Sequence, residues 1–191
     1  MRDRTKGITL MNPAKPIIPI FFAVDDNYAP YLAVSMRSLI DNASPDYQYN
    51  IYILIDKLNE YNTAVLCGMT TDNVSVETIN VTRKLDAFGD MLHLRDYYTK
   101  TTYYRFFIPA LFPQYERGLY LDCDIVVTGD IAQLYRVPLG DRLLAAAPEE
   151  VMRMVDVFGT YVEAVLEVPR NEYFSAGILV MNLEKMRRVA L

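Results

Sequence analysis

Apolar runs of strand length alternate with helical periodicity along the first 80 residues. A continuous apolar run over 17–24 is followed by two further strand candidates, at 49–55 and 74–79. Between them, 29–40 carries apolar residues at helical spacing, and 58–69 is predicted as a second helix. Continuous apolar runs are typical of strands buried on both faces of a parallel sheet. The order strand-helix-strand-helix-strand indicates the first half of a doubly wound α/β fold, a mostly parallel sheet with helices on both faces.

The second half of the chain continues the pattern less regularly. An aromatic-rich helix is predicted over 102–111, after a connection over 83–100 that has no clear pattern. The remaining predicted elements are strands at 119–121, 143–147 and 173–181, a helix over 149–166 that Gly159 weakens, and a helix that begins at Asn182. Residues 1–15 show no periodicity. We therefore expect a flexible N-terminal arm over 1–15 and one domain over 16–191.

Composition and charge narrow the class of partner. The 191 residues are 52% hydrophobic and 23% charged, which is ordinary for a globular domain. The formal net charge of −5 argues against nucleic acid as a partner, because an acidic chain has no long-range attraction for a phosphate backbone. Two cysteines form neither a disulfide framework nor a C-x-x-C pair, so the cytoplasm is the expected compartment. No apolar stretch approaches the roughly 20 residues that span a bilayer, and peripheral contact with the inner face of a membrane stays open.

Two acidic clusters directly follow predicted strands. Asp25-Asp26-Asn27 comes after the first strand, and Asp122-Cys123-Asp124 comes after the fourth. In a sheet of order 3-2-1-4 these two strands are neighbours, and ligands bind beyond their carboxyl ends. Two carboxylates on alternate residues suit a hard divalent cation such as Mn²⁺ or Mg²⁺, which can bridge to a diphosphate. The sequence therefore predicts a metal and nucleotide site at this edge.

Neighbouring polar residues extend this candidate site. Asp25 and Asn27 supply an acceptor and an amide that suit the polar edges of a base or ribose. We expect Asp26 or Asn27 to cap the following helix and leave Asp25 for a ligand. Arg105 could project its guanidinium towards phosphates or a sugar. Cys123 has acidic neighbours that disfavour a thiolate, so it is expected to pack and not to act as a nucleophile.

Four segments together resemble one known family. They are Ala23-Val24-Asp25-Asp26-Asn27-Tyr28, Thr101-Thr102-Tyr103-Tyr104-Arg105, Leu119-Tyr120-Leu121-Asp122-Cys123-Asp124 and Tyr173-Phe174-Ser175-Ala176-Gly177. In this order and rough spacing they resemble family 8 glycosyltransferases, which include bacterial lipopolysaccharide galactosyl- and glucosyltransferases and the glycogenins. The resemblance covers about 19–187. It implies a GT-A fold, a UDP-hexose donor, Mn²⁺ dependence, retention of configuration and a saccharide or glycolipid acceptor.

The resemblance also implies roles for individual residues. Asp122 and Asp124 would bind Mn²⁺, with Asp122 also near the ribose, and Arg105 would contact the phosphate or sugar side of the donor. The residues that would line the uridine pocket are Ala23, Asp25, Asn27 and Tyr28. Ser175 stands where the family usually has Asn close to the transferred sugar, so its catalytic role is a weaker expectation.

The chain also departs from the family at its C-terminal end. The family continues to a His-x-x-Gly-x-x-Lys-Pro segment whose histidine completes the metal site, whereas the single histidine here, His93, lies in no such context. We therefore expect most of the acceptor site to be missing. Two alternatives stay open: a UDP-sugar-binding protein without catalysis, and a haloacid-dehalogenase-like phosphatase, whose Asp-x-Asp-x-Val-Val pattern matches 122–127. The sequence does not specify the sugar, the acceptor or the oligomeric state.

Overall fold

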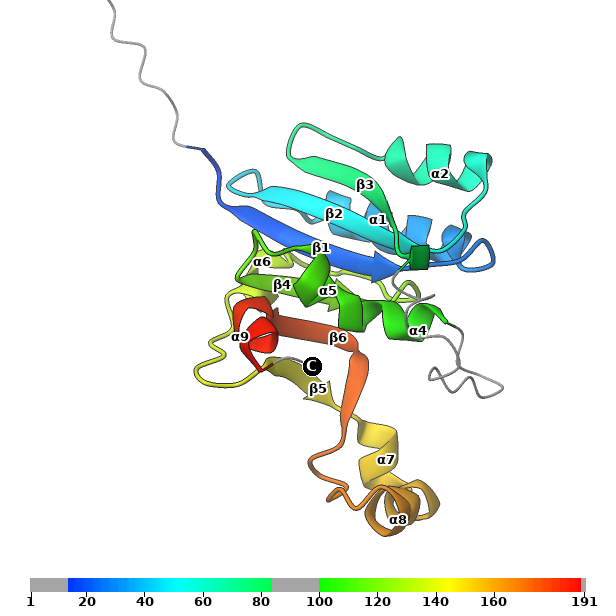
Figure 1. Cartoon of the computed structure of the whole chain (residues 1–191), viewed down its shortest axis with the longest axis vertical. Coiled ribbons are helices and arrows are strands. Elements are labelled where there is room, and N and C mark those ends of the chain that lie inside the picture. The colour runs from blue at the N-terminus through cyan, green and yellow to red at the C-terminus, as the bar shows by residue number, and fades with distance from the viewer. Residues whose placement is uncertain (1–13, 84–99, 190–191) are drawn as a thin grey trace, which may run out of the picture.

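A single six-stranded sheet organises the protein (Figure 1). The computed structural model describes residues 14–83 and 100–189. The strands are β1 (Ile17–Ala23), β2 (Gln48–Ile55), β3 (Val74–Asn80), β4 (Arg117–Leu121), β5 (Leu144–Pro148) and β6 (Phe174–Asn182). Their order across the sheet is β3-β2-β1-β4-β6-β5. The first four strands run parallel, whereas β6 is antiparallel to both β4 and β5. The predicted order 3-2-1-4 is therefore confirmed.

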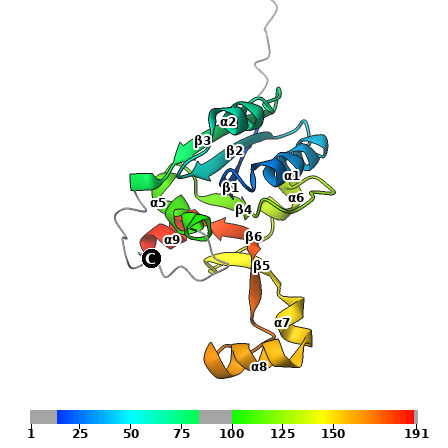
Figure 2. The same cartoon turned by 90° about the vertical axis from the view of Figure 1, so that its right-hand side faces the viewer.

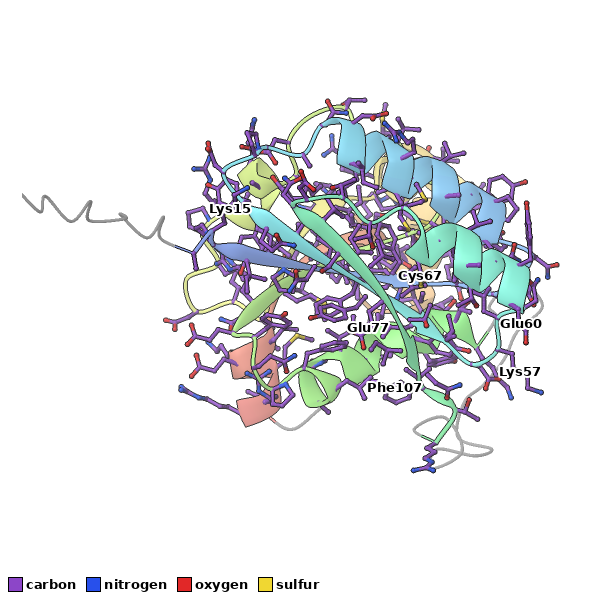
Figure 3. The ribbon with its side chains drawn as sticks, turned by 90° about the horizontal axis from the view of Figure 1, so that it is seen from above. Lys15, Lys57, Glu60, Cys67, Glu77 and Phe107 are labelled. Carbon is purple, nitrogen blue, oxygen red and sulfur yellow. The ribbon has the colours of Figure 1, made fainter. Side chains whose placement is uncertain are left out.

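Helices cover both faces of this sheet, as predicted (Figure 2). One face carries α1 (Ala29–Asp41), α2 (Glu60–Cys67) and α6 (Ala132–Tyr135). The other carries α4 (Thr101–Tyr104), the 3₁₀ turn η2 (Arg105–Phe107), α5 (Ile108–Leu111) and α9 (Leu183–Arg188). Figure 3 shows this separation from above, with Cys67 of α2 and Phe107 of η2 on opposite sides of the strands. The protein is thus a three-layer α/β fold.

The strand pleat divides the core between these two layers. In β1, Ile18, Ile20 and Phe22 face the layer of α1, whereas Phe21 faces the layer of α4. In β4, Tyr120 faces the α4 layer and is only 2% exposed. Successive side chains of a strand point to opposite faces, so a sheet buried on both sides needs apolar residues at every position. The unbroken apolar run over 17–24 has this physical cause.

Two predicted helices are divided in the structure, and one short helix was not predicted. The helix expected over 102–111 is divided among α4, η2 and α5, with Pro109 at the start of α5. The helix expected over 149–166 breaks at Val155, whose backbone is extended, into α7 (Glu150–Met154) and α8 (Asp156–Val165). Gly159, which was expected to weaken it, lies inside α8. The short α6 carried no recognisable sequence signal. Most of the predicted N-terminal arm lies outside the described residues, and the division into arm and domain stays a prediction.

The hairpin of α7 and α8 projects from the edge of the sheet (Figures 1 and 2). Arg170, which follows α8, is joined to that helix through a forked contact with Glu163 and a bond to Asp156. Several of its apolar side chains face solvent, among them Met154 and Val157, which are 75% and 76% exposed. Within 14–83 and 100–189, none of the helices has the length and apolar character that crossing a bilayer requires.

Candidate functional site

The two acidic clusters meet at one edge of the sheet, as predicted. Strands β1 and β4 are parallel neighbours with Phe21 opposite Tyr120, so both strands end at the same edge. A hydrogen bond joins the two ends, because the Cys123 thiol donates to the carbonyl oxygen of Ala23 at 3.0 Å. Cys123 is 6% exposed, which agrees with the packing role expected for it. The topology therefore brings residues that are about a hundred positions apart into one site.

A pocket of about 200 Å³ opens at this junction. Its lining comprises Ala23, Val24, Asp25, Tyr28, Thr101, Thr102, Arg105, Tyr120, Asp122, Cys123 and Asp124. Six of the predicted site residues are therefore gathered in one pocket. Asn27 is exposed and outside this lining, and so is the half-buried Ser175, whose hydroxyl accepts a hydrogen bond from the Gly177 amide at 3.4 Å.

Neither Asp26 nor Asn27 caps α1, which corrects that expectation: the N-cap is Tyr28, without a side-chain cap bond, and Asp25 instead holds the turn before the helix. One oxygen of Asp25 accepts hydrogen bonds from the backbone N–H groups of Asn27 and Tyr28, at 2.9 and 3.0 Å. Asp26 instead accepts from the backbone and side chain of Asn59, the N-cap residue of α2. The cause is local geometry, because Asp25 follows the end of β1 by two residues and its side chain lies beside the amides of the next turn. Asp25 still lines the pocket.

Arg105 is held in the pocket wall by four contacts. Its Nε–H donates to the carbonyl of Thr102 at 3.0 Å, and one terminal nitrogen donates to the carbonyl of Ala176. Its other terminal nitrogen lies 3.3 Å from a carboxylate oxygen of Asp122, and its guanidinium carbon is 4.3 Å from the centre of the Tyr120 ring. The side chain is only 11% exposed. Arg105 is thus a fixed positive charge and not a mobile arm.

Asp122 is the most constrained carboxylate of the site. Its Oδ1 accepts from the Tyr120 hydroxyl at 2.9 Å in addition to its contact with Arg105. Its backbone N–H donates to the carbonyl of Gly177 in the neighbouring strand β6 at 2.7 Å. Tyr120 was not among the predicted site residues. Its position two residues before Asp122 places both side chains on one face of the strand, and that alternation was the available signal.

Burial raises the pKa of two groups in this pocket. The pKa of the Cys123 thiol rises to about 12, first because burial disfavours the thiolate and then because Asp122 and Asp124 repel its charge. The pKa of Tyr120 also rises well above its ordinary value, mainly through burial and against the opposing effect of Arg105. Both groups therefore stay protonated at neutral pH and act as hydrogen-bond donors.

The donor set suits a divalent metal that shares its coordination shell with a ligand. Asp122 and Asp124 both line the pocket, but within the described residues no three His, Cys, Asp or Glu side chains cluster around a possible metal position. Mg²⁺, and by similar oxygen preference Mn²⁺, is commonly held by one or two carboxylates together with substrate phosphates and water. The two aspartates fit that arrangement. His93 lies outside the described residues.

Solved glycosyltransferase structures resemble this fold. The bifunctional glycosyltransferase WbbM matches with a TM-score of 0.76 and 31% identity, over 94% of this chain and 34% of that one. The galactosyltransferase LgtC, solved with donor and acceptor sugar analogues, matches with a TM-score of 0.71 and 30% identity, over 90% of this chain and 60% of that one. The GT-A fold expected from the sequence is therefore confirmed.

Curated relatives give the same result. General stress protein A of Bacillus subtilis is 27% identical over 90% of this chain, and lipopolysaccharide 1,2-glucosyltransferase of Escherichia coli is 27% identical over 87%. The chain spans about half the length of these relatives, 58% and 48% respectively. The family described as glycosyl transferase family 8 matches residues 19–191. This match rules against the phosphatase alternative. The chain belongs to glycosyltransferase family 8.

Proposed function

We propose that the protein acts as a metal-dependent retaining glycosyltransferase, which transfers a hexose from a UDP-sugar to a saccharide acceptor. The observation that carries the proposal is one pocket in which Asp25 and Tyr28 meet Asp122, Asp124 and Arg105. A nucleotide-sugar diphosphate needs polar and aromatic groups for its base, and positive charge for its phosphates. The net charge of −5 makes a bound cation the natural source of most of that charge.

The uridine is assigned to the end of the pocket formed by β1 and the start of α1. Ala23 and Asp25 lie at the pocket wall, and Tyr28 offers a ring that is 49% exposed for stacking on a base. The turn before α1 occupies one oxygen of Asp25, and the other can accept from the base or ribose. Asn27 contributes an exposed amide beside them.

The diphosphate is assigned to the end formed by β4. Asp122 and Asp124 hold Mn²⁺ or Mg²⁺, with Asp122 also near the ribose. Such an ion, when bound, stabilises the negative charge that grows on the departing UDP. Arg105 uses three of its five N–H donors within the described residues, so its fixed guanidinium offers further donors to a phosphate or sugar oxygen. Ser175, one residue before Ala176, is a weaker candidate for contact with the transferred sugar.

The names of the relatives support a proposal for the acceptor class. One is a lipopolysaccharide 1,2-glucosyltransferase, and LgtC is a galactosyltransferase. We propose a lipopolysaccharide or another cell-surface glycan as the acceptor, and a cytoplasmic site of action with peripheral contact at the inner face of the membrane. Binding of the UDP-sugar without transfer is the second candidate, because the same pocket residues would serve donor binding alone.

Calorimetric titration of UDP with and without Mn²⁺ tests the site. We expect binding that depends on Mn²⁺ in the wild-type chain and no detectable binding in Asp122→Ala/Asp124→Ala, because two carboxylates of the cation site are gone. Asp41→Ala/Asp46→Ala is the matched control, since it removes two acidic charges outside the pocket and should bind as wild type does. Equal binding by the Asp122/Asp124 double variant would contradict the proposed site. A transferred sugar of retained anomeric configuration separates the transferase from the binding protein.

A further inference from the structure

The two oxygens of the Asp122 carboxylate have different surroundings. Oδ1 receives the Tyr120 hydroxyl at 2.9 Å and lies 3.3 Å from the Arg105 guanidinium. Oδ2 has no hydrogen-bond partner in the ranges 14–83 and 100–189, and it lies against Gly177. The carboxylate itself is 38% exposed, so it remains open to the pocket. The protein therefore satisfies one oxygen and leaves the other for a ligand.

Tyr120, which is held in the core, causes this difference between the two oxygens of Asp122. Its side chain is 2% exposed and packs in the core between the sheet and α4. The guanidinium of Arg105 stacks on its ring, so the same tyrosine supports both donors to Oδ1. Close packing around the buried ring restricts its motion and keeps the hydroxyl beside Oδ1.

From this geometry we infer that Tyr120 is a positioning residue that determines which cation the site accepts. With Oδ1 engaged by two donors, Asp122 serves as a ligand through one oxygen only. Mg²⁺ and Mn²⁺ favour octahedral shells that accept single oxygens, whereas Ca²⁺ takes six to eight oxygens and readily binds both oxygens of a carboxylate. The arrangement therefore favours the smaller cations over Ca²⁺. This inference rests on the proposed function.

The test compares UDP affinity in Mn²⁺ with UDP affinity in Ca²⁺, by calorimetry on the full chain. In Tyr120→Phe we expect the ratio of the two affinities to fall roughly tenfold, because Oδ1 loses a charge-assisted hydrogen bond and becomes free to bind Ca²⁺. Tyr49→Phe is the matched control. Tyr49 is also buried in the sheet, and its hydroxyl donates to Asp130 at 2.6 Å, away from the pocket. Its ratio should equal that of wild type.

A second variant covers a failure of Tyr120→Phe to fold, which circular dichroism would reveal. Arg105→Lys keeps the charge but loses the planar fork, so the ratio should fall in the same direction. A direct contact of Arg105 with UDP changes both affinities equally. It therefore cancels from the ratio, which compares two cations on one variant. An unchanged ratio in a folded Tyr120→Phe chain would overturn the inference but not the proposed function. If Tyr120→Phe does not fold, an unchanged ratio in Arg105→Lys would have the same meaning. A wild-type chain whose UDP binding ignores both cations would instead overturn the proposed function.

Discussion

Gly177 leaves room for the Asp122 carboxylate, and a methyl group there would remove it. A Cβ built at this position would lie 2.7 Å from Oδ2 of Asp122, which is closer than side chains approach. Asp122 cannot easily retreat, because Tyr120 and Arg105 hold its other oxygen. The free oxygen and the glycine thus depend on each other.

We therefore predict that Gly177→Ala weakens Mn²⁺-dependent UDP binding, on the order of tenfold, while the chain keeps its fold. Replacing glycine in a strand by alanine otherwise gains about 0.5–1 kcal/mol of backbone entropy, which offsets part of the strain. Calorimetry measures the affinity, and the midpoint of urea unfolding measures the stability. Gly129→Ala is the control, since an added Cβ there meets nothing within 4 Å. Undiminished binding by Gly177→Ala would mean that the carboxylate is free to move.

At this scale, the sequence predicted which residues gather but not how their atoms pair. Asp122 and Asp124 could be found because carboxylates on alternate residues after a strand have a recognisable chemistry. The sequence could not show that Asp25 binds the amides of its own turn whereas Asp26 binds Asn59, because both aspartates begin the same turn. The hydrogen bond from Tyr120 required knowledge of the rotamers, which periodicity does not contain.

The helix α1 contains two serines with opposite environments. Ser35 is fully buried, and its hydroxyl has no hydrogen-bond partner in the part of the chain that the structure describes. The Ser38 hydroxyl donates to the carbonyl of Ser35 at 2.7 Å and accepts from the backbone N–H of Val127 at 2.8 Å. Ser38 therefore joins the helix to the loop that follows the Asp-x-Asp segment, whereas Ser35 only fills space.

We predict that Ser35→Ala raises the free energy of unfolding by about 1 kcal/mol, since it removes a buried unpaired hydroxyl and favours the helix. Ser38→Ala should lower it by about 1–2 kcal/mol, since it leaves the Val127 amide without its acceptor. Urea unfolding of both variants provides the measurement. The pair is its own control, because the two changes delete the same atom from one helix. Destabilisation of similar size in both would show that Ser35 has a partner, such as a bound water.

The helices and strands were largely predictable from the sequence. The differences between prediction and structure had local causes. The pattern of apolar residues identified all six strands, most clearly β1, which is buried on both faces of the sheet. The break at Val155 left no such signal, since its extended backbone follows from the turn between α7 and α8 and not from a glycine or proline. The reversal of β6 relative to β4 was likewise invisible, because strand direction depends on the connection and not on the pattern of the strand.

Across the whole molecule, the core protects a set of ionisable hydroxyl and thiol groups. Burial raises the pKa of Tyr104 and of Cys123 to about 12 in each case. Burial also raises the pKa values of Tyr49, Tyr52 and Tyr120. These residues lie in both core layers, on either side of the sheet. Their ionisation is thus coupled to the integrity of the entire fold.

We predict that stability is lost on the alkaline side for this reason. In the unfolded chain these tyrosines ionise near pH 10 and the cysteine near pH 8.5. The folded state keeps its protons to higher pH, so the unfolded state binds fewer protons above those values, and the free energy of unfolding falls as pH rises. The full contribution is present below about pH 8.5. Between the two pKa values, one such group removes about 1.4 kcal/mol for each pH unit.

Urea unfolding at a series of pH values from neutral to alkaline measures this slope, and tyrosinate absorbance recorded with far-ultraviolet circular dichroism shows when the buried rings ionise. We expect their ionisation to coincide with the loss of secondary structure. Tyr49→Phe supplies an internal check, because it removes one buried hydroxyl and should reduce the alkaline slope by one group's share. Ionisation of the buried tyrosines in a chain that keeps its full secondary structure would mean that the core admits hydroxide locally. In that case the sheet and its two helical layers would not unfold as one unit.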